Sequence, residues 1–367
     1  MPSNTCATRA TTRHCPHGTT NAWFMQTVEL PISKSIANRL LLKSAIEGGD
    51  LALPVTGNRL PDDTRLILGV LRHAQIVATT LSPTTYNLDN CATAMRFLTA
   101  YFADRESCEV ILTGCERMKQ RPIGQLVDAL RCIGADITYL EKEGFPPLMI
   151  RGKRLDKSRE VTILEPLSTQ YISALILIGA NVTTDCHSPY IDMTRTILSG
   201  YSTLERDWSA AAFFYENTAL TGKEYFFPAL SLNSCQGDQM VAEVFRQLGV
   251  ATEEINDGIL IRPDNKPIAK TLTLDFSLCP DLYPALYATC VLLGVEKQFT
   301  GMQALTIKES NRIEAMQQIE QLPAKGTCLS SHNDHRIAMA LIAAGYKVDN
   351  SECIHKSFPD FLLNFEN

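Results

Sequence analysis

The chain has 367 residues, of which 45% are hydrophobic, and its 34 Lys and Arg against 40 Asp and Glu give a formal net charge of −6. This acidic balance argues against a surface that binds nucleic acid. No run of apolar residues approaches the roughly 18 that a membrane span needs, so we expect neither nucleic acid nor a membrane as a partner. The length and the apolar content favour two domains with a large buried core.

Residues 1–25 contain no acidic residue and no sustained apolar stretch. A short transit-like segment and a plain extension both fit this composition; the weak amphipathicity favours the extension, so we predict a disordered leader. Cys6, His14, Cys15 and His17 lie in it, but their spacing fits no standard metal site. The twelve cysteines of the chain form no C-x-x-C pair, which is typical of reduced thiols in a cytoplasmic protein.

Along the rest of the chain a polar cap followed by an Ala-rich or aliphatic helix recurs, at residues 33–46, 90–102, 168–179, 207–219, 280–294 and 333–345. Segments of β-type residues bounded by Gly, Pro or Asp lie between them, at 110–114, 135–152 and 258–263. The helix at 168–179 is apolar on nearly every side, which predicts a buried helix. We expect six weak α/β repeats, three in each of two similar domains; an ordinary α/β protein with buried helices also fits the irregular spacing.

Basic residues stand near the starts of several of these helices: Lys34, Arg39, Arg96, Arg121, Lys308, Arg312 and Arg336. A helix N-terminus has unpaired N–H groups and a partial positive charge, so an added Lys or Arg creates an anion site that the fold itself does not need. Several such sites in an acidic chain predict a small polyanionic substrate.

A series of short motifs becomes recognisable from about residue 28 to the C-terminus, in the order SKSIANR, DNCATAMR, LTGCERMKQRPIGQLVDALRCIGADI, LSTQY, SPYIDM, ERDWSAA, QGD, PDLYPAL, IKESNRI, NDHRIAM and KSFPDF. Each motif is weak alone, but the ordered series resembles the family of 5-enolpyruvylshikimate-3-phosphate synthases. The related enolpyruvyl transferase of cell-wall synthesis shares that fold, but its opening motif is built around Lys-Asn. Ser33-Lys34-Ser35 with Arg39 therefore favours the shikimate enzyme.

The resemblance implies two domains, each of three βαβαββ units with buried parallel helices, in an inside-out arrangement similar to an α/β barrel. It places a first repeat domain, on the shikimate-phosphate side, at residues 26–205 and a second at 206–367, with chain crossings near the N-terminus and near residues 205–207. It also implies a cytoplasmic monomer whose partners are two small molecules, shikimate 3-phosphate and phosphoenolpyruvate.

The resemblance further implies which residues bind the substrates, whose phosphates and carboxylates suit Arg and Lys. Those expected around shikimate 3-phosphate are Lys34, Ser35, Arg39, Ser168, Thr169, Gln170, Asp281 and Lys308. Those expected around phosphoenolpyruvate are Lys34, Asn90, Ala92, Thr93, Arg121, Gln170, Arg312, Arg336 and Lys356. Ser168 and Thr169 also fit plain helix caps, and Lys356 alone also fits a solvated surface charge.

By the same resemblance the catalytic residues are Lys34, Asp281 and Glu309. The 5-hydroxyl must lose a proton as it attacks C2 of phosphoenolpyruvate, C3 must gain a proton, and phosphate leaves when C3 is deprotonated again. Glu309 and Arg312 are three residues apart, so one helical turn can bring them to one site; a surface ion-pair cluster is the alternative. Phosphoenolpyruvate carries its own leaving group, so we expect no cofactor and no metal.

Two departures from the family pattern bear on function. Ala92 occupies the Gly position of a turn that in this family normally reads Asn-Ala-Gly-Thr. Its methyl group should narrow the phosphoenolpyruvate pocket, a change that in this family accompanies lowered sensitivity to glyphosate. Only 14 residues separate Asp192 from Asp207, and 25 separate Glu309 from His335, so we expect some repeat strands to be missing. This leaves open a catalytically impaired homologue that only binds shikimate-type phosphates, whereas the complete set of charged residues favours an active enzyme.

Overall fold

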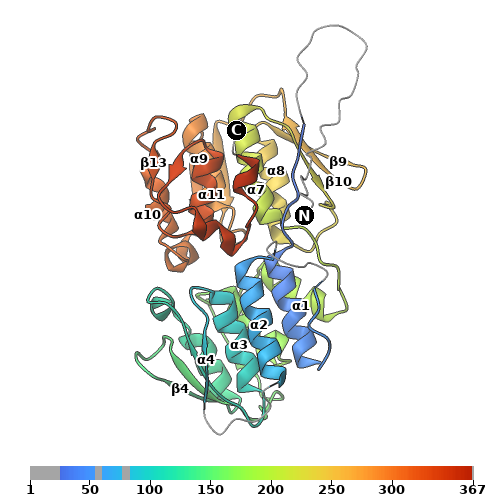
Figure 1. The fold of residues 1–367 in the computed structure, drawn as a ribbon, viewed down its shortest axis with the longest axis vertical. Coiled ribbons are helices and arrows are strands. Elements are labelled where there is room, and N and C mark those ends of the chain that lie inside the picture. The colour runs from blue at the N-terminus through green and yellow to red at the C-terminus, as the bar shows by residue number, and fades with distance from the viewer. Residues whose placement is uncertain (1–24, 54–59, 77–82, 366–367) are drawn as a thin grey trace, which may run out of the picture.

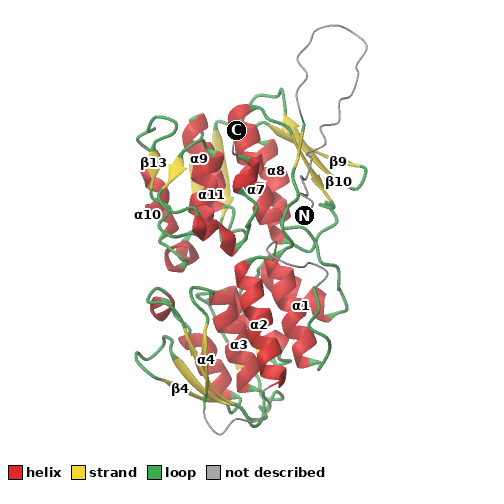
Figure 2. Ribbon diagram, in the orientation of Figure 1, coloured by secondary structure: helices red, strands yellow, loops and turns green. Residues whose placement is uncertain are grey.

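The computed structural model describes residues 25–53, 60–76 and 83–365, which form two lobes stacked along the long axis (Figure 1). The predicted disordered leader, apart from Met25, lies outside the described residues. Each lobe is a layered α/β structure in which helices lie side by side and sheets cover them from outside (Figure 2).

The lower lobe in Figure 1 follows the first half of the chain. Its helices are α1 (Lys34–Ile46), α2 (Asp62–Ile76), α3 (Ala92–Ala103), α4 (Gly124–Cys132), α5 (Thr169–Leu177) and α6 (Pro189–Leu198). Its larger sheet has the order β2 (Thr84–Asn87), β3 (Glu109–Thr113), β5 (Leu148–Arg151) and β4 (Asp136–Tyr139). In it β2 and β3 are parallel, while β5 is antiparallel to both β3 and β4. A second sheet consists of two short parallel strands, β6 (Val161–Thr162) and β7 (Val182–Thr183).

The upper lobe follows the second half. Its helices are α7 (Trp208–Thr221), α8 (Val241–Arg246), α9 (Tyr283–Leu293), α10 (Arg312–Met316) and α11 (His335–Ala343). Its larger sheet has the order β1 (Gln26–Thr27), β8 (Tyr225–Pro228), β10 (Gly258–Pro263) and β9 (Val250–Ile255). Two parallel pairs complete it: β11 (Thr271–Asp275) with β12 (Glu296–Thr300), and β13 (Cys328–Leu329) with β14 (Lys347–Val348).

The expected loss of repeat strands is confirmed. The segment β2–α3–β3–α4–β4–β5 is a complete βαβαββ unit, whereas β6–α5–β7–α6 and β11–α9–β12–α10 stop before the last two strands. Within the described residues no β-strand lies between α6 and α7 or between α10 and β13. The two shortened units therefore keep their helices and their parallel strand pair and lack only the antiparallel hairpin.

Each lobe has its own large hydrophobic core, and the chain passes between the lobes twice. Val28 and Leu30 pack in the upper core, whereas Ile32 packs in the lower one. An isolated antiparallel bridge joins Ile32 to Arg206, so both crossings run side by side. The segment 26–30 thus packs with the upper lobe, which differs from the boundary expected from the sequence, because β1 hydrogen-bonds to β8.

Two general expectations concern the helices and the cysteines. None of the described helices combines the length and the apolar character that crossing a bilayer requires. All the cysteines in the described part of the chain are free thiols, which agrees with the reduced state expected from their spacing.

Candidate active site

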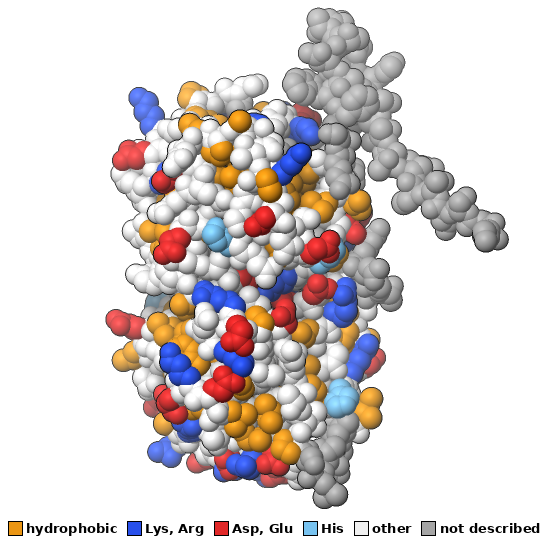
Figure 3. Space-filling model, turned by 60° about the vertical axis from the view of Figure 1, so that its left-hand side comes forward, with side chains coloured by type: hydrophobic (Ala, Val, Ile, Leu, Met, Phe, Trp, Pro, Cys, Tyr) orange, Lys and Arg blue, Asp and Glu red, His pale blue; other side chains and the backbone are white. Residues whose placement is uncertain are grey.

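The lobes meet at a waist where Lys and Arg side chains lie beside Asp and Glu side chains (Figure 3). From the lower lobe, Lys34 begins α1, Asp63 lies in the first turn of α2, and Asn90 lies just before α3. From the upper lobe come the loop before α10, the start of α11, and the short helix η6 (Glu352–Lys356). Helix starts carry unpaired N–H groups and a partial positive charge, so their convergence favours anions at this waist.

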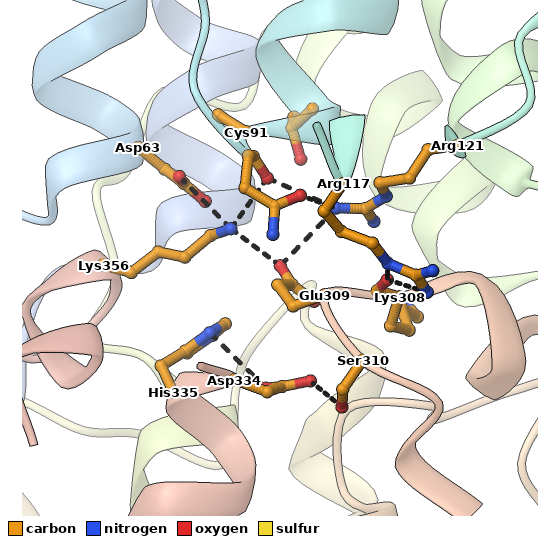
Figure 4. A network of polar contacts seen from close by, with 12 residues as sticks. Asp63, Cys91, Arg117, Arg121, Lys308, Glu309, Ser310, Asp334, His335 and Lys356 are labelled. Atoms are coloured by element: carbon orange, nitrogen blue, oxygen red, sulfur yellow. Dashed lines mark hydrogen bonds and ion pairs between the residues drawn. The ribbon is translucent and has the colours of Figure 1, made fainter. Parts of the chain in front are cut away.

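Lys356 reaches from the upper lobe to the lower one (Figure 4). Its Nζ lies 2.9 Å from Glu309 Oε1 and 3.9 Å from Asp63 Oδ1, and it donates to the backbone carbonyl of Asn90 at 2.8 Å. Burial alone would lower the pKa of Lys356, but the carboxylates of Asp63 and Glu309 outweigh burial and raise that pKa above its ordinary value. Lys356 is therefore a largely buried cation between the lobes and not a solvated surface charge.

Lys34 and Arg121 supply the cations of the lower lobe. Lys34 Nζ lies 2.9 Å from Asp63 Oδ2. Arg121 is buried, and its Nη1 donates to the side-chain and backbone oxygens of Asn90 at 3.2 and 3.3 Å and lies 3.9 Å from Glu309 Oε1. The Nε of Arg121 finds no hydrogen-bond partner among the described residues, so one buried donor is free for an anionic ligand.

Arg312 is the most deeply buried cation of the site, with 1% of its side chain exposed. Its guanidinium binds Asp334 Oδ2 at 2.8 Å, Asp281 Oδ1 at 2.9 Å and Glu309 Oε2 at 3.1 Å. Burial opposes the charge of Arg312, but Asp334, Glu309 and Asp281 together raise its pKa. The helical turn expected to hold both residues is wrong, because α10 begins only at Arg312 and Glu309 lies in the loop before it. Glu309 and Arg312 nevertheless form a largely buried pair and not a surface ion-pair cluster.

Asp281 is held by three cations. Its Oδ2 accepts from Arg336 Nη2 at 2.8 Å, and its Oδ1 lies 3.5 Å from Lys308 Nζ as well as beside Arg312. Burial would raise the pKa of Asp281, but Arg336, Lys308 and Arg312 hold it well below its ordinary range. Asp281 is therefore ionised, and a ligand anion that engaged these cations would raise its pKa and make it a stronger proton acceptor.

The pKa of Glu309 follows the same balance. Burial would raise it, but Lys356, Arg121 and Arg312 hold it well below its ordinary range. These three cations come from η6, the segment before α4, and α10, so both lobes contribute to the charge state of one carboxylate. A ligand anion that engaged the same cations would weaken their effect and let the pKa of Glu309 rise.

Gln170 links the starts of α3 and α5 in the lower lobe. Its Oε1 accepts from Arg96 Nη1 at 2.6 Å, and its Nε2 donates to Thr93 Oγ1 at 2.9 Å. Ser168 is the N-cap of α5, because its hydroxyl accepts from the N–H of Gln170, and Thr169 begins that helix. The expected cap role of Ser168 is therefore present, and capping leaves the hydroxyl at the helix start, where a ligand can also reach it.

Arg39 lies apart from the Glu309 cluster, deeper in the lower lobe. Its Nε donates to Thr194 Oγ1 at 2.8 Å, and its Nη2 donates to Ser173 Oγ at 3.3 Å and to the carbonyl of Tyr190 at 3.2 Å. Arg39 Nη1 also donates to the carbonyl of Ser35 at 2.9 Å, and burial lowers the pKa of Arg39 to about 10. Arg39 thus braces α1 against α5 and α6.

Two acidic residues at the waist, Asp63 and Asp334, were not predicted from the sequence. Asp63 pairs with both Lys34 and Lys356, but two acids in a first turn are ordinary complements to a helix dipole, so nothing singled it out. Asp334 caps α11 by accepting from the N–H of Arg336 and also anchors Arg312. The NDHRIAM motif contains it, and its cap position was the one available signal.

A metal ion has one candidate group of ligands in the described part of the chain. Ligand atoms of Glu309, Asp334 and His335 lie within 4.8 Å of one another. Burial and the nearby charge of Lys34 lower the pKa of His335, which is therefore neutral. The two carboxylates already bind Arg312, and a further cation would meet that charge at close range, so this set fits a metal ion poorly.

The arrangement defines a class of protein: a two-lobed α/β protein with buried cationic side chains gathered between its lobes, which suits a small polyanionic ligand. The chain belongs to the EPSP synthase (3-phosphoshikimate 1-carboxyvinyltransferase) family, whose model matches residues 21–203 and 199–365.

Individual relatives agree with this assignment. The chain is 36% identical to a 3-phosphoshikimate 1-carboxyvinyltransferase of Bacteroides fragilis over 399 aligned positions, which cover 91% of this chain and 93% of the relative. It is 30% identical to a protein of that name from Hamiltonella defensa, over 91% of this chain and 94% of the relative. Because 91% of 367 residues is fewer than 399, the first alignment contains gaps in this chain, as the shortened repeats require.

The solved structure of an EPSP synthase from Acinetobacter baumannii has the same fold. It matches 92% of this chain and 94% of its own chain with a TM-score of 0.64 at 21% sequence identity. The expected fold class, two α/β domains of the enolpyruvyl transferase type, is confirmed.

Proposed function

We propose that this protein is a 3-phosphoshikimate 1-carboxyvinyltransferase, which transfers the enolpyruvyl group of phosphoenolpyruvate to the 5-hydroxyl of shikimate 3-phosphate and releases phosphate. One observation carries the proposal: Lys356, Arg121 and Arg312 converge from both lobes on Glu309. Three cations around one carboxylate suit a substrate that brings a phosphate and a carboxylate of its own.

We infer that phosphoenolpyruvate binds to the cations around Glu309. Arg121 offers a free Nε, and Lys34 and Lys356 approach the same side from α1 and η6. Asn90, Ala92, Thr93 and Gln170 line the starts of α3 and α5 on the lower side, and Arg312 and Arg336 the upper side. Shikimate 3-phosphate would lie toward Ser35, Arg39, Ser168, Thr169, Asp281 and Lys308.

The positions of the two carboxylates divide the proton transfers between them. Asp281, beside Lys308, accepts the proton of the 5-hydroxyl as the hydroxyl oxygen bonds to C2 of phosphoenolpyruvate. Glu309, among the phosphoenolpyruvate cations, gives a proton to C3 and takes it back as the C2–O bond to phosphate breaks. Binding of the substrate anion to Lys356 and Arg121 raises the pKa of Glu309, so the carboxyl can hold that proton when it is needed.

Both shortened repeats carry site residues, but the hairpins that they lack lie away from the site. The missing hairpins would follow α6 and α10, whereas the residues assigned to the reaction lie at helix starts and in the loops before them. The ion pairs formed by the residues assigned to the reaction are complete, which supports an active enzyme over a homologue that only binds shikimate-type phosphates.

The experiment is to measure phosphate release by the purified protein given both substrates, with Lys34→Met as the comparison. Lys34 carries one of the largely buried charges of the site, so we expect release that requires both substrates and falls by a factor of about 100 or more in the variant. Circular dichroism and the melting temperature of the variant check that it is folded. No release from folded wild-type protein would instead favour the impaired homologue, and light scattering of the same sample tests the expected monomer.

Ala92 provides a second prediction, about affinity. Ala92 begins α3 beside the predicted phosphoenolpyruvate position and is buried. Removing its methyl group widens the pocket, so we expect Ala92→Gly to lower the KM for phosphoenolpyruvate and to increase inhibition by glyphosate. Steady-state kinetics with and without glyphosate measure both effects, and Ala94→Gly, two residues further along the same buried helix, is the matched control. An unchanged KM in Ala92→Gly would contradict the proposed narrowing.

A further inference from the structure

A second contact between the lobes lies beside the site, where the start of α6 meets the short helix η3 (Gly237–Met240). The hydroxyl of Tyr190 donates to Asp238 Oδ1 at 2.8 Å, and Asp238 Oδ2 accepts from the hydroxyl of Ser209. A Cβ atom at Gly237 would overlap the side chain of Pro189, so glycine is needed for this approach. Buried hydrogen bonds and close backbone packing together indicate a specific docking point between the lobes.

Tyr190 connects this docking point to residues of both lobes that are assigned to shikimate 3-phosphate. Its backbone carbonyl accepts from Arg39 Nη2, in the lower lobe. On the other side, its hydroxyl and the carboxyl of Asp238 both experience the charges of Asp281 and Arg336 in the upper lobe. Tyr190 therefore lies between Arg39, which braces α1, and Asp281, the carboxylate assigned to accept the proton of the 5-hydroxyl.

We propose that Asp238 is a positioning residue for the transfer reaction, which holds Tyr190 and with it the lower lobe so that Arg39 and Asp281 act on the same substrate. The inference rests on the proposed function, because shikimate 3-phosphate is the ligand that would span Arg39 and Asp281. Asp238 is 2% exposed and follows Gly237, whose backbone closely approaches Pro189. Asp238 therefore acts through Tyr190 and not through contact with solvent.

The surroundings of Asp238 also predict how its action depends on pH. The polar and ionisable groups around it come from other elements: Tyr190, Ser209, Cys279, Asp281 and Arg336. Burial and the charge of Asp281 raise the pKa of Asp238 to about 6, against the opposing effects of Ser209, Arg336 and Tyr190. Asp238 is thus ionised above about pH 6 and loses its charge as the pH falls through that value, which weakens its bond to Tyr190.

The kinetic test is Asp238→Asn, which keeps the shape of the side chain and removes its charge. Loss of one charge-assisted hydrogen bond corresponds to a change of about tenfold to a hundredfold, so at pH 8 we expect the KM for shikimate 3-phosphate to rise by at least about tenfold. The substrate phosphate also takes up a proton near about pH 6 and affects both proteins. As the pH is lowered from 8 to 5, the wild-type KM should therefore rise more steeply than the variant KM, and the two values should converge. Asp192→Asn, an exposed carboxylate on α6, is the control and should match the wild type.

Tyr190→Phe tests whether Asp238 acts through Tyr190. It should reproduce the rise in KM, and the double variant Asp238→Asn with Tyr190→Phe should show no further rise beyond either single variant. The proposal is overturned if Asp238→Asn keeps the wild-type KM at pH 8, or if the two single effects multiply in the double variant. An effect on stability alone would change the melting temperature and leave the pH profile of KM intact.

A measurement without catalysis separates this inference from the proposed function. Gly237→Ala should prevent docking of the lobes, so its radius of gyration in X-ray scattering should exceed that of the wild type. Gly69→Ala, a helical glycine of α2 with open space around the added atom, is the matched control and should leave the radius unchanged. Wild-type protein without phosphate release but with this difference would refute the activity and keep the docking point; equal radii in Gly237→Ala and Gly69→Ala would refute the docking point.

Discussion

Glu309→Gln is expected to keep the binding of both substrates and to lose turnover by a factor of about 100 to 10,000, the range that general acid–base catalysis supplies. Glutamine has the shape of glutamate but cannot exchange a proton with C3. Its neutral amide also competes less for Lys356, Arg121 and Arg312, so those cations remain available to phosphoenolpyruvate.

The measurement pairs steady-state phosphate release with equilibrium titration of phosphoenolpyruvate in the presence of shikimate 3-phosphate. Glu314→Gln is a matched control, because Glu314 lies on the same helix α10 but is exposed. Unchanged turnover in Glu309→Gln would reject the proton-transfer role. Lost binding with a normal melting temperature would assign Glu309 to substrate binding.

Glu216→Met is expected to stabilise the protein by about 1–3 kcal/mol at pH 7, the cost of burying polar groups without partners. Glu216 lies on α7 in the upper core, is fully buried, and neither carboxyl oxygen has a hydrogen-bond partner among the described residues. Burial raises the pKa of Glu216 well above its ordinary value, and the charge of Lys325 only partly offsets this. Methionine fills a similar volume with an apolar chain.

The raised pKa of Glu216 also determines how stability depends on pH. The folded protein binds the Glu216 proton more tightly than the unfolded chain does. The contribution of Glu216 to the free energy of unfolding is therefore fully present below the pKa that Glu216 has in the unfolded chain, and it falls as the pH rises toward the pKa that Glu216 has in the folded protein. Glu216→Gln, which cannot ionise, should match the wild type in acid and exceed it at higher pH. Glu216→Met should exceed both throughout.

Melting temperatures of the three proteins from pH 4.5 to 8, measured by calorimetry, test this prediction. The scans should be read for the upper lobe, because two lobes with separate cores need not unfold together. A Glu216→Met protein that melts no higher than the wild type at pH 7 would show that the buried carboxyl has found a partner.

The local features of this protein could be predicted from its sequence. The caps at Ser168 and Asp207 and the buried helices were visible as short-range patterns, because capping and helix burial depend on residues within one or two turns. The shortened repeats were visible as well, because a missing hairpin is a missing length of chain. Lys308, Glu309 and Arg312 could be placed at one site because they lie within five consecutive residues.

The partners of each charge were decided by the tertiary structure. Lys356 contacts Asn90 across 266 positions of the chain, Tyr190 meets Asp238 across 48, and β1 pairs with β8 in the opposite half. Such contacts depend on where the two chain crossings place the lobes, which no local pattern records. The ionisation of Glu309 and Glu216 depends in turn on burial and on those distant partners, so the same residue type has a pKa well below its ordinary range at one position and well above it at the other.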